Sequence, residues 1–477
     1  MTAGDLLTLA PLIALALSAV VVMLAAAFAR SHALALTLTV LGLGITLGTL
    51  FVSAGRESHQ VTPLLVFDDF ALFVIGLIVV ATTVVALLSW GYLQQGRVDP
   101  EEHYVLLLTA TLGAATLAAS TQFATLFLGL EILSVSLYAL IAYPLAREES
   151  VEAAVKYLVL AGATSAFLVF GMALVYAQTG TMVLASLAPF LSLTPPDGGA
   201  LVVTGLLLIL GGLGFKLAVV PLHMWTPDIY QGAAAPVSAF VATVSKGAVV
   251  ALLLRAFPPA SLEKGSAVFL VLALVAIASM LAGNLLALRQ DNVKRILAYS
   301  SIANMGYVLV AFLATGEGAS VAVTLFLVAY AAASLAAFGV VTVLSTGVRD
   351  AERLDDYRGL AANRPWLTAV MTVSLFSLAG IPLTLGFVGK FFVVTAGAGA
   401  AMWSLVIVLV LTSTIGLYYY TRIIVVMFVP RAGHEVATER RAPAGIALAA
   451  LTVFVLAFGV YPAPLIRLVE WAVATLD

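Results

Sequence analysis

The chain has 477 residues, of which 62% are hydrophobic and only 10% are charged, and its mean hydropathy is +1.13. Charged residues make up about 25% of a typical soluble domain, so this chain carries too few to cover a surface that faces water. We therefore predict an integral membrane protein. The sequence has no cysteine and only five histidines, which excludes disulfides and thiolate-bound metals or iron–sulfur clusters. The net charge of −2 gives no reason to expect nucleic-acid binding.

Breaks in hydropathy at charged or Pro/Gly clusters predict about 14 transmembrane helices in an all-α polytopic fold. Roughly 20 apolar residues cross a hydrocarbon core about 30 Å thick, and the alternation typical of barrel strands is nowhere sustained. The expected spans are 5–29, 33–53, 70–93, 104–121, 123–145, 154–179, 200–220, 234–257, 265–288, 293–313, 319–346, 365–397, 401–428 and 443–468.

Lysine and arginine are divided unequally between the predicted loops. Loops after even-numbered spans contain only Arg56 and Lys264. Loops after odd-numbered spans contain Arg30, Arg97, Arg147, Arg289, Lys294, Arg295, Arg349, Arg353, Arg358, Arg364, Arg431, Arg440 and Arg441. Because basic residues concentrate in cytoplasmic loops, we expect the odd-numbered loops in the cytoplasm and both termini outside.

Two predicted spans are interrupted, at Pro221 and at Pro382. Proline removes a backbone donor and clashes with the carbonyl four residues earlier, so it breaks a helix. Each break is accompanied by a lysine and a Gly-Phe step, and the two breaks lie five spans apart. Since five is odd, the second copy of such a unit runs upside down relative to the first. Broken helices in inverted repeats indicate transport sites near the membrane midplane, although two unrelated proline kinks are the alternative.

This pattern predicts four segments. Residues 1–100 form an N-terminal three-helix segment, and residues 101–260 form a first five-helix repeat with one half-channel. Residues 261–430 form the second, inverted repeat, and residues 431–477 contain a C-terminal transmembrane helix.

Apart from charges near the ends of spans, such as Arg422 in the last turns of the thirteenth span, four charged residues fall within the predicted spans: Glu131, Lys216, Lys246 and Lys390. A charge at the bilayer centre costs about 2.5–3.5 kcal/mol on insertion scales, so four such residues indicate a function. A desolvated lysine can release its proton near neutral pH, whereas arginine stays protonated. A nearby carboxylate keeps a lysine charged, so a change in the distance between Glu131 and Lys216 would switch proton uptake and release.

Polar residues at helical spacing accompany these charges, and we expect them to hold a file of water molecules. They are Ser134 and Tyr138 after Glu131, Thr243 before Lys246, and the set Ser300, Asn304 and Tyr307.

Structural alternatives exist for several of these residues. Glu131 and Lys216 could form a fixed ion pair, and Lys390 could extend its amine to the membrane interface. His223, beside Pro221, could relay protons or cap a helix end. Lys156 follows three glutamates, a pattern typical of a solvated helix start.

Several ordered stretches of the chain resemble the antiporter-like subunits of respiratory complex I. The matching stretches cover roughly residues 100–430, and the resemblance is highly specific. Within that family, the Gly-Leu-Glu start of the first stretch and the whole second stretch resemble subunit N. The stretches are Leu128–Ser134, Glu152–Tyr157, Phe215–Lys246, Asn292–Ile302 and Gly380–Lys390.

The resemblance implies a role for each buried residue. Glu131 would be the carboxylate that modulates Lys216, Lys246 the central lysine that receives the proton, and Lys390 the terminal lysine that releases it. Lys156 and His223 would be accessory relay positions.

Asn304 is a departure from the family pattern, since the family often has histidine there. An amide cannot take up a proton at physiological pH. A proton-holding step at this position is therefore in doubt, and Asn304 would orient water instead.

The resulting hypothesis is a proton-translocating membrane-arm subunit of a bacterial NADH:quinone oxidoreductase, located in the cytoplasmic membrane. Protons would move outward from the cytoplasm, driven by quinone reduction in other subunits. The resemblance implies no cofactor or metal bound by this chain, with NADH, FMN, iron–sulfur clusters and quinone held elsewhere in the complex. Its partners would be other membrane-arm subunits and the lipid bilayer. The alternatives are an Mrp-type cation/proton antiporter subunit and a scaffold that does not pump.

Overall fold

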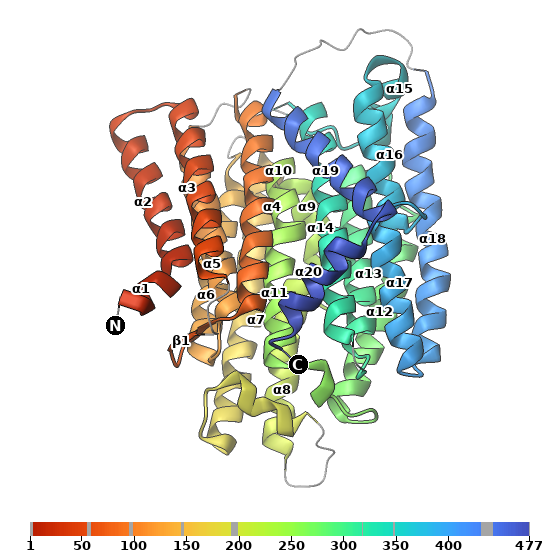
Figure 1. Cartoon of the computed structure of the whole chain (residues 1–477). Coiled ribbons are helices and arrows are strands. Elements are labelled where there is room, and N and C mark those ends of the chain that lie inside the picture. The colour runs from red at the N-terminus through yellow and green to blue at the C-terminus, as the bar shows by residue number, and fades with distance from the viewer. Residues whose placement is uncertain are drawn as a thin grey trace.

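The computed structural model describes residues 3–54, 59–94, 99–144, 147–191, 199–316, 318–346, 349–430 and 442–476. Within these ranges, 13 helices are long and apolar enough to cross a membrane, and two shorter apolar helices accompany them. The helices run side by side, with α2 and α3 at one edge of the bundle and α18 at the other (Figure 1). This arrangement confirms an all-α polytopic membrane protein.

The first half of the chain contains one small hairpin and most of the helices of the first predicted repeat. Its elements are α1 (Ala3–Thr8), α2 (Ala10–Phe28), α3 (His32–Ser53), β1 (His59–Thr62), β2 (Leu65–Phe67), α4 (Asp69–Leu93), α5 (Glu101–Ala119), α6 (Phe123–Ala142), α7 (Glu148–Thr179), η1 (Leu184–Phe190), α8 (Ala200–Leu217), α9 (Trp225–Gly232), α10 (Ala235–Phe240), the π-helical turn η2 (Val241–Ser245), α11 (Lys246–Ala256) and η3 (Pro259–Ser261).

The second half continues with helices alone. They are α12 (Ala267–Ala287), α13 (Val293–Phe312), α14 (Ala319–Leu344), η4 (Leu354–Tyr357), α15 (Leu360–Asn363), α16 (Pro365–Ala379), α17 (Leu385–Gly399), α18 (Trp403–Phe428), α19 (Ala442–Val460) and α20 (Ala463–Val473). Both α1 and the end of α20 lie in the lower part of the view in Figure 1.

The observed elements differ from the predicted spans in several places, and the first span is two helices, α1 and α2. The antiparallel hairpin of β1 and β2 was not expected, because strands of four and three residues are too short to show alternation. The helix α7 begins at Glu148 instead of residue 154, and acidic residues in its first turn suit the positive end of the helix dipole. The final span is two helices, α19 and α20, because the chain breaks at Tyr461 and Pro462.

The predicted loop cations are only partly covered by the structure. Arg56, Arg97, Arg431, Arg440 and Arg441 lie outside the described residues. The loop assignment of Lys294 is wrong: it is the second residue of α13, and its side chain is 0% exposed. Its neighbours in sequence are charged, so hydropathy alone makes this helix start look like a solvated loop.

Three spans occupy the interior of the bundle: residues 235–256, α13 and α14. Other helices surround them, and nearly all of their residues are buried. Lys246, Asn304 and Tyr330 lie on these three spans and are themselves buried. These polar groups therefore face protein and not lipid.

Candidate functional site: a row of buried lysines

The first broken helix carries Lys216. Helix α8 ends at Leu217, the next residue has a left-handed backbone with φ of 62°, and α9 begins seven residues later at Trp225. Leu217 is the residue whose carbonyl Pro221 was expected to displace, so the predicted break is confirmed. Lys216, in the last turn of α8, is 2% exposed.

Hydroxyl groups and aromatic rings surround the Lys216 ammonium. It donates to Ser134 Oγ at 2.7 Å and to the Tyr157 hydroxyl at 3.2 Å. The nitrogen also lies 5.0 Å from the centre of the Tyr157 ring, a cation–π contact. Ser134 comes from α6, one helical turn after Glu131, so the predicted shared face of α6 does reach Lys216.

Glu131 does not form the fixed ion pair with Lys216 that the sequence left open. Its carboxylate accepts a hydrogen bond from Ser165 Oγ of α7 at 2.7 Å. Among the described residues, no carboxylate oxygen lies within 4.0 Å of the Lys216, Lys246 or Lys390 nitrogen. The contact that α6 makes with the Lys216 ammonium is therefore Ser134 and not Glu131.

The second lysine, Lys246, follows the π-helical turn η2 and is 0% exposed. Turns of this kind occur frequently at functional sites. The Lys246 ammonium donates to Ser301 Oγ at 2.6 Å, and Ser301 Oγ lies 2.5 Å from the Tyr330 hydroxyl. The Tyr230 hydroxyl is 3.4 Å from the same serine oxygen. Ser301 Oγ therefore contacts all three of the other polar groups: the Lys246 ammonium and the hydroxyls of Tyr330 and Tyr230.

The predicted polar sets contained neither Ser301 nor Tyr330. They contained Ser300, whose hydroxyl bonds to the Tyr420 hydroxyl of α18, and Thr243, whose hydroxyl donates to the carbonyl of Ala239 in its own helix at 2.7 Å. Adjacent serines point in directions about 100° apart on a helix, so the rotation of α13 decides which one reaches Lys246.

The second broken helix carries Lys390. Helix α16 ends at Ala379, Gly380 has a φ of 84°, and α17 starts at Leu385. The Lys390 ammonium donates to the Ala379 carbonyl and to Ser413 Oγ, each at 2.8 Å. The side chain passes directly over Gly380, where an added Cβ would lie 2.7 Å from Lys390 Cδ. Lys390 therefore points into the break, and its amine is bound there instead of extending along the helix as the alternative had it.

A small cavity lies between Lys390 and Tyr330, the tyrosine that contacts Ser301. It is about 10 Å³, and Asn304, Tyr330, Ser377 and Lys390 are among the residues that line it. This volume is about the space of one water molecule, and the lining supplies several polar partners. The Asn304 amide donates to the Ser300 carbonyl at 2.8 Å.

The accessory positions lie nearer the periphery. Lys156 has a side chain that is 44% exposed, and it pairs with Glu152 at 2.7 Å and Asp228 at 3.1 Å. The run of glutamates does lie at the start of α7, and the solvated helix start remains a prediction. His223 is half-buried in the connection between α8 and α9.

Two further buried ion pairs were not predicted. Lys294 pairs with Asp350 at 2.5 Å, and both side chains are 0% exposed. Arg255 holds both carboxylate oxygens of Asp68, at 2.7 and 2.8 Å. The partners are 56 and 187 residues apart, so no local pattern in the sequence could join them.

Arg147 also contacts Asp350, with its Nη1 3.5 Å from the carboxylate. Arg147 lies just before α7. Burial is the largest single influence and disfavours its charge, but Asp350, Tyr92 and Glu352 together outweigh burial and raise the pKa of the guanidinium.

The fold and the buried lysines define a class of protein, the antiporter-like membrane subunits. Residues 120–416 match the family described as "NADH:quinone oxidoreductase/Mrp antiporter, TM", and the chain belongs to that family. It is 52% identical to NADH-quinone oxidoreductase subunit N of Nitrosospira multiformis, over 98% of this chain and 96% of that protein. This places the chain in the subunit N family.

Solved structures show the same architecture. A chain in respiratory complex I from Thermus thermophilus with bound aureothin is 33% identical, with a TM-score of 0.81, over 96% of this chain and 98% of that chain. A chain in the Mrp complex from Dietzia sp. shares the fold, with a TM-score of 0.85 at 23% identity, over 100% of this chain and 98% of that chain. The predicted family and fold class are confirmed.

Proposed function

We propose that this chain is the proton-translocating subunit N of a bacterial NADH:quinone oxidoreductase. Protons move from the cytoplasm to the outside through its interior, driven by quinone reduction in other subunits. NADH, FMN, iron–sulfur clusters and quinone belong to those other subunits. Other membrane-arm subunits and lipid cover the outer faces of the bundle.

The observation that carries this proposal is the environment of Lys246. Its ammonium is fully buried and has a hydroxyl partner. Among the described residues, no carboxylate lies within 4.0 Å to stabilise the positive charge. Such a group is poised to release its proton, since burial disfavours the charged form. A merely structural lysine would be expected to have a paired anion.

The second half of the route runs from Lys246 to Lys390. It passes through the hydroxyls of Ser301 and Tyr330, then through one water in the cavity that Asn304, Tyr330 and Lys390 line. Hydroxyls and water both donate and accept hydrogen bonds, so they can pass a proton along. Asn304 orients the water without holding a proton.

The first half of the route starts from Glu131 and Lys216. Ser134 lies between them, since it follows Glu131 by one turn and accepts from Lys216. A shift of the Glu131 carboxylate relative to Lys216 changes how strongly the lysine holds its proton. Lys156 and His223 serve as accessory positions near the cytoplasmic end and the break.

The orientation follows from the loop cations. Regions after odd-numbered spans face the cytoplasm, and both termini lie outside. Because the chain has no cysteine, single cysteines placed in loops can be labelled with a membrane-impermeant thiol reagent. Labelling of a Thr346→Cys variant in intact cells, without permeabilisation, would contradict this orientation.

The test of the proposal uses Glu131→Gln and Lys390→Met in the assembled complex, reconstituted into vesicles. We expect proton translocation per quinone reduced to fall while the amount of assembled complex stays normal. Loss of assembly with unchanged stoichiometry would instead identify a scaffold. A sodium gradient that sustains turnover without quinone reduction would identify an antiporter.

A further inference from the structure

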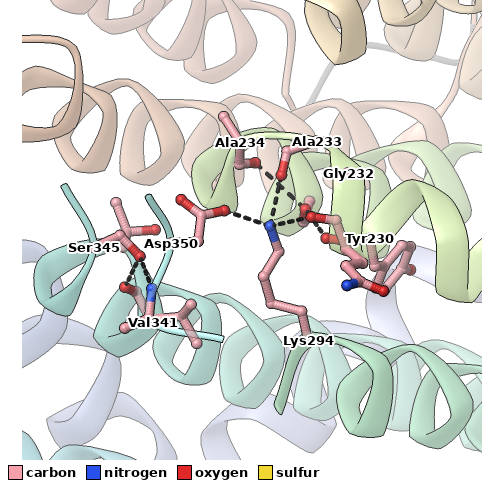
Figure 2. Close-up of polar contacts among 12 residues, drawn as sticks. Tyr230, Gly232, Ala233, Ala234, Lys294, Val341, Ser345 and Asp350 are labelled. Carbon is pink, nitrogen blue, oxygen red and sulfur yellow. Dashed lines mark hydrogen bonds and ion pairs between the residues drawn. The ribbon is translucent and has the colours of Figure 1, made fainter. Parts of the chain in front are cut away.

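The buried pair of Lys294 and Asp350 lies outside the row of lysines that carries the proposed transport. Lys294 is at the start of α13, and Asp350 is in the connection between α14 and η4. Figure 2 shows Lys294 pointing to Asp350 and to the backbone that joins α9 to α10. Asp350 Oδ1 also accepts from the Tyr92 hydroxyl of α4 at 2.9 Å and pairs with Arg147 at 3.5 Å.

The charges in this cluster do not balance by themselves. Two cations, Lys294 and Arg147, contact the single anion Asp350, so these three contacting groups carry one excess positive charge, with Glu352 as a more distant anion. Lys294 compensates for the excess through backbone dipoles: it donates to the carbonyls of Gln231 at 2.9 Å and Ala233 at 2.6 Å. These carbonyls lie at the end of α9, the partly negative end of a helix.

The turn from α9 to α10 is held on its other side by α7. Ser150 Oγ donates to the Gly232 carbonyl at 2.7 Å. An added Cβ at Gly232 would lie 2.5 Å from the Glu149 carbonyl oxygen, so only glycine fits. Three successive carbonyls, from 231 to 233, thus accept side-chain hydrogen bonds, and they satisfy helix-end groups that would otherwise be unpaired.

This turn leads directly into the helical segment that carries Lys246. Residues 235–256 run on from the turn as α10, η2 and α11, with Lys246 directly after the π-helical turn. Lys294 and Asp350 come from the second predicted repeat, whereas the turn and Arg147 come from the first. The cluster therefore ties the position of the Lys246 helix to the opposite half of the molecule.

We propose that Asp350 and Lys294 form an electrostatic clamp that positions the 231–234 turn and, through it, Lys246. Asp350 is then a positioning residue for proton transfer, a role that rests on the proposed function. Its charge keeps Lys294 directed at the carbonyls of α9. Without it, Lys294 and Arg147 repel each other and the turn loses its cap.

The experiment compares Asp350→Asn in the assembled complex with the control Asp355→Asn, whose side chain is 77% exposed and pairs only with Arg358. Backbone hydrogen exchange of residues 229–240 is followed by mass spectrometry beside proton translocation. In Asp350→Asn we expect exchange in the turn to rise at least about tenfold, the scale of losing one hydrogen bond from a charged group. Translocation should fall about tenfold or more, because a small misplacement of a reacting group is costly. The control should match wild type.

A charge-restoring variant separates electrostatics from packing. Asp350→Asn leaves two cations, whereas adding Lys294→Met returns the cluster to one cation, the wild-type net charge. We expect the double variant to recover part of the translocation lost in Asp350→Asn. A double variant that is worse than the single one would overturn the electrostatic clamp.

Other results for these variants would also test the clamp and the positioning role of Asp350. Unchanged exchange in Asp350→Asn would overturn the clamp, and raised exchange with normal translocation would overturn the positioning role. If Asp350→Asn fails to assemble, Lys294→Gln, which removes the excess positive charge of the three contacting groups, should still raise exchange in the turn. Failure of the proposed function would appear separately, as normal pumping in a Lys246 variant, whatever the exchange data show.

Discussion

Replacing Lys246 by methionine should abolish proton transport while leaving the stability of the protein unchanged or higher. The lysine is fully buried and donates to Ser301 Oγ at 2.6 Å, with no carboxylate of the described residues within 4.0 Å. Burying an unpaired ion costs several kcal/mol, and substitution of buried charges by apolar side chains of similar size is often stabilising by about 1–4 kcal/mol. Methionine nearly matches the length of the lysine stem. We therefore expect Lys246→Met to be as stable as wild type or more so.

Transport should nevertheless be lost, because a thioether cannot hold a proton at any working pH. A positioned group that gives and takes a proton contributes about 10²–10⁴-fold to the rate of a transfer step. We expect proton movement through this subunit to fall by a factor in that range. The assay is quinone reduction coupled to acidification of proteoliposomes, together with thermal unfolding of the purified complex.

Lys264→Met is the matched control. Lys264 lies in the connection between η3 and α12, and its amine donates to the carbonyl of Ala400 at the end of α17. It should retain normal stoichiometry. The reasoning would be refuted if Lys246→Met pumped at the wild-type ratio, or if it lost pumping only in proportion to a loss of folded complex.

Three other substitutions test the remaining parts of the site. Lys216→Arg keeps the charge but cannot release its proton, so pumping should fall to the level of Lys216→Met; wild-type pumping would contradict the switchable-lysine argument. Gly380→Ala places a Cβ at a φ of 84° and 2.7 Å from Lys390 Cδ, so we expect about 1–3 kcal/mol of strain and reduced translocation, whereas Gly399→Ala, with no heavy atom within 4 Å of the added Cβ, should be normal. Asp68→Asn removes the anion that binds Arg255 and should destabilise the fold by about 3–5 kcal/mol; a changed proton-to-electron ratio in the folded fraction would contradict this purely structural role.

Much of the fold was predictable from the sequence because membrane insertion depends on local composition. A run of about 20 apolar residues is enough to identify a span, and the broken spans were recognisable from proline alone. The helix end at Leu217 agrees with the position that Pro221 predicts, and the end at Ala379 lies one residue beyond Leu378, the position that Pro382 predicts. Lys216, Lys246 and Lys390 were conspicuous for the same reason, since each is a charge alone in an apolar run.

Contacts between helices were decided only by the tertiary structure. The rotation of α13 brings Ser301 and not Ser300 to Lys246, and the separation of α6 from α8 leaves Glu131 bonded to Ser165 rather than paired with Lys216. The burial of Lys294 depends on Asp350, 56 residues further along the chain. The physical reason is one of range: hydropathy and helix breaks act along the chain within a few turns, whereas the pairing of buried charges depends on how distant helices pack.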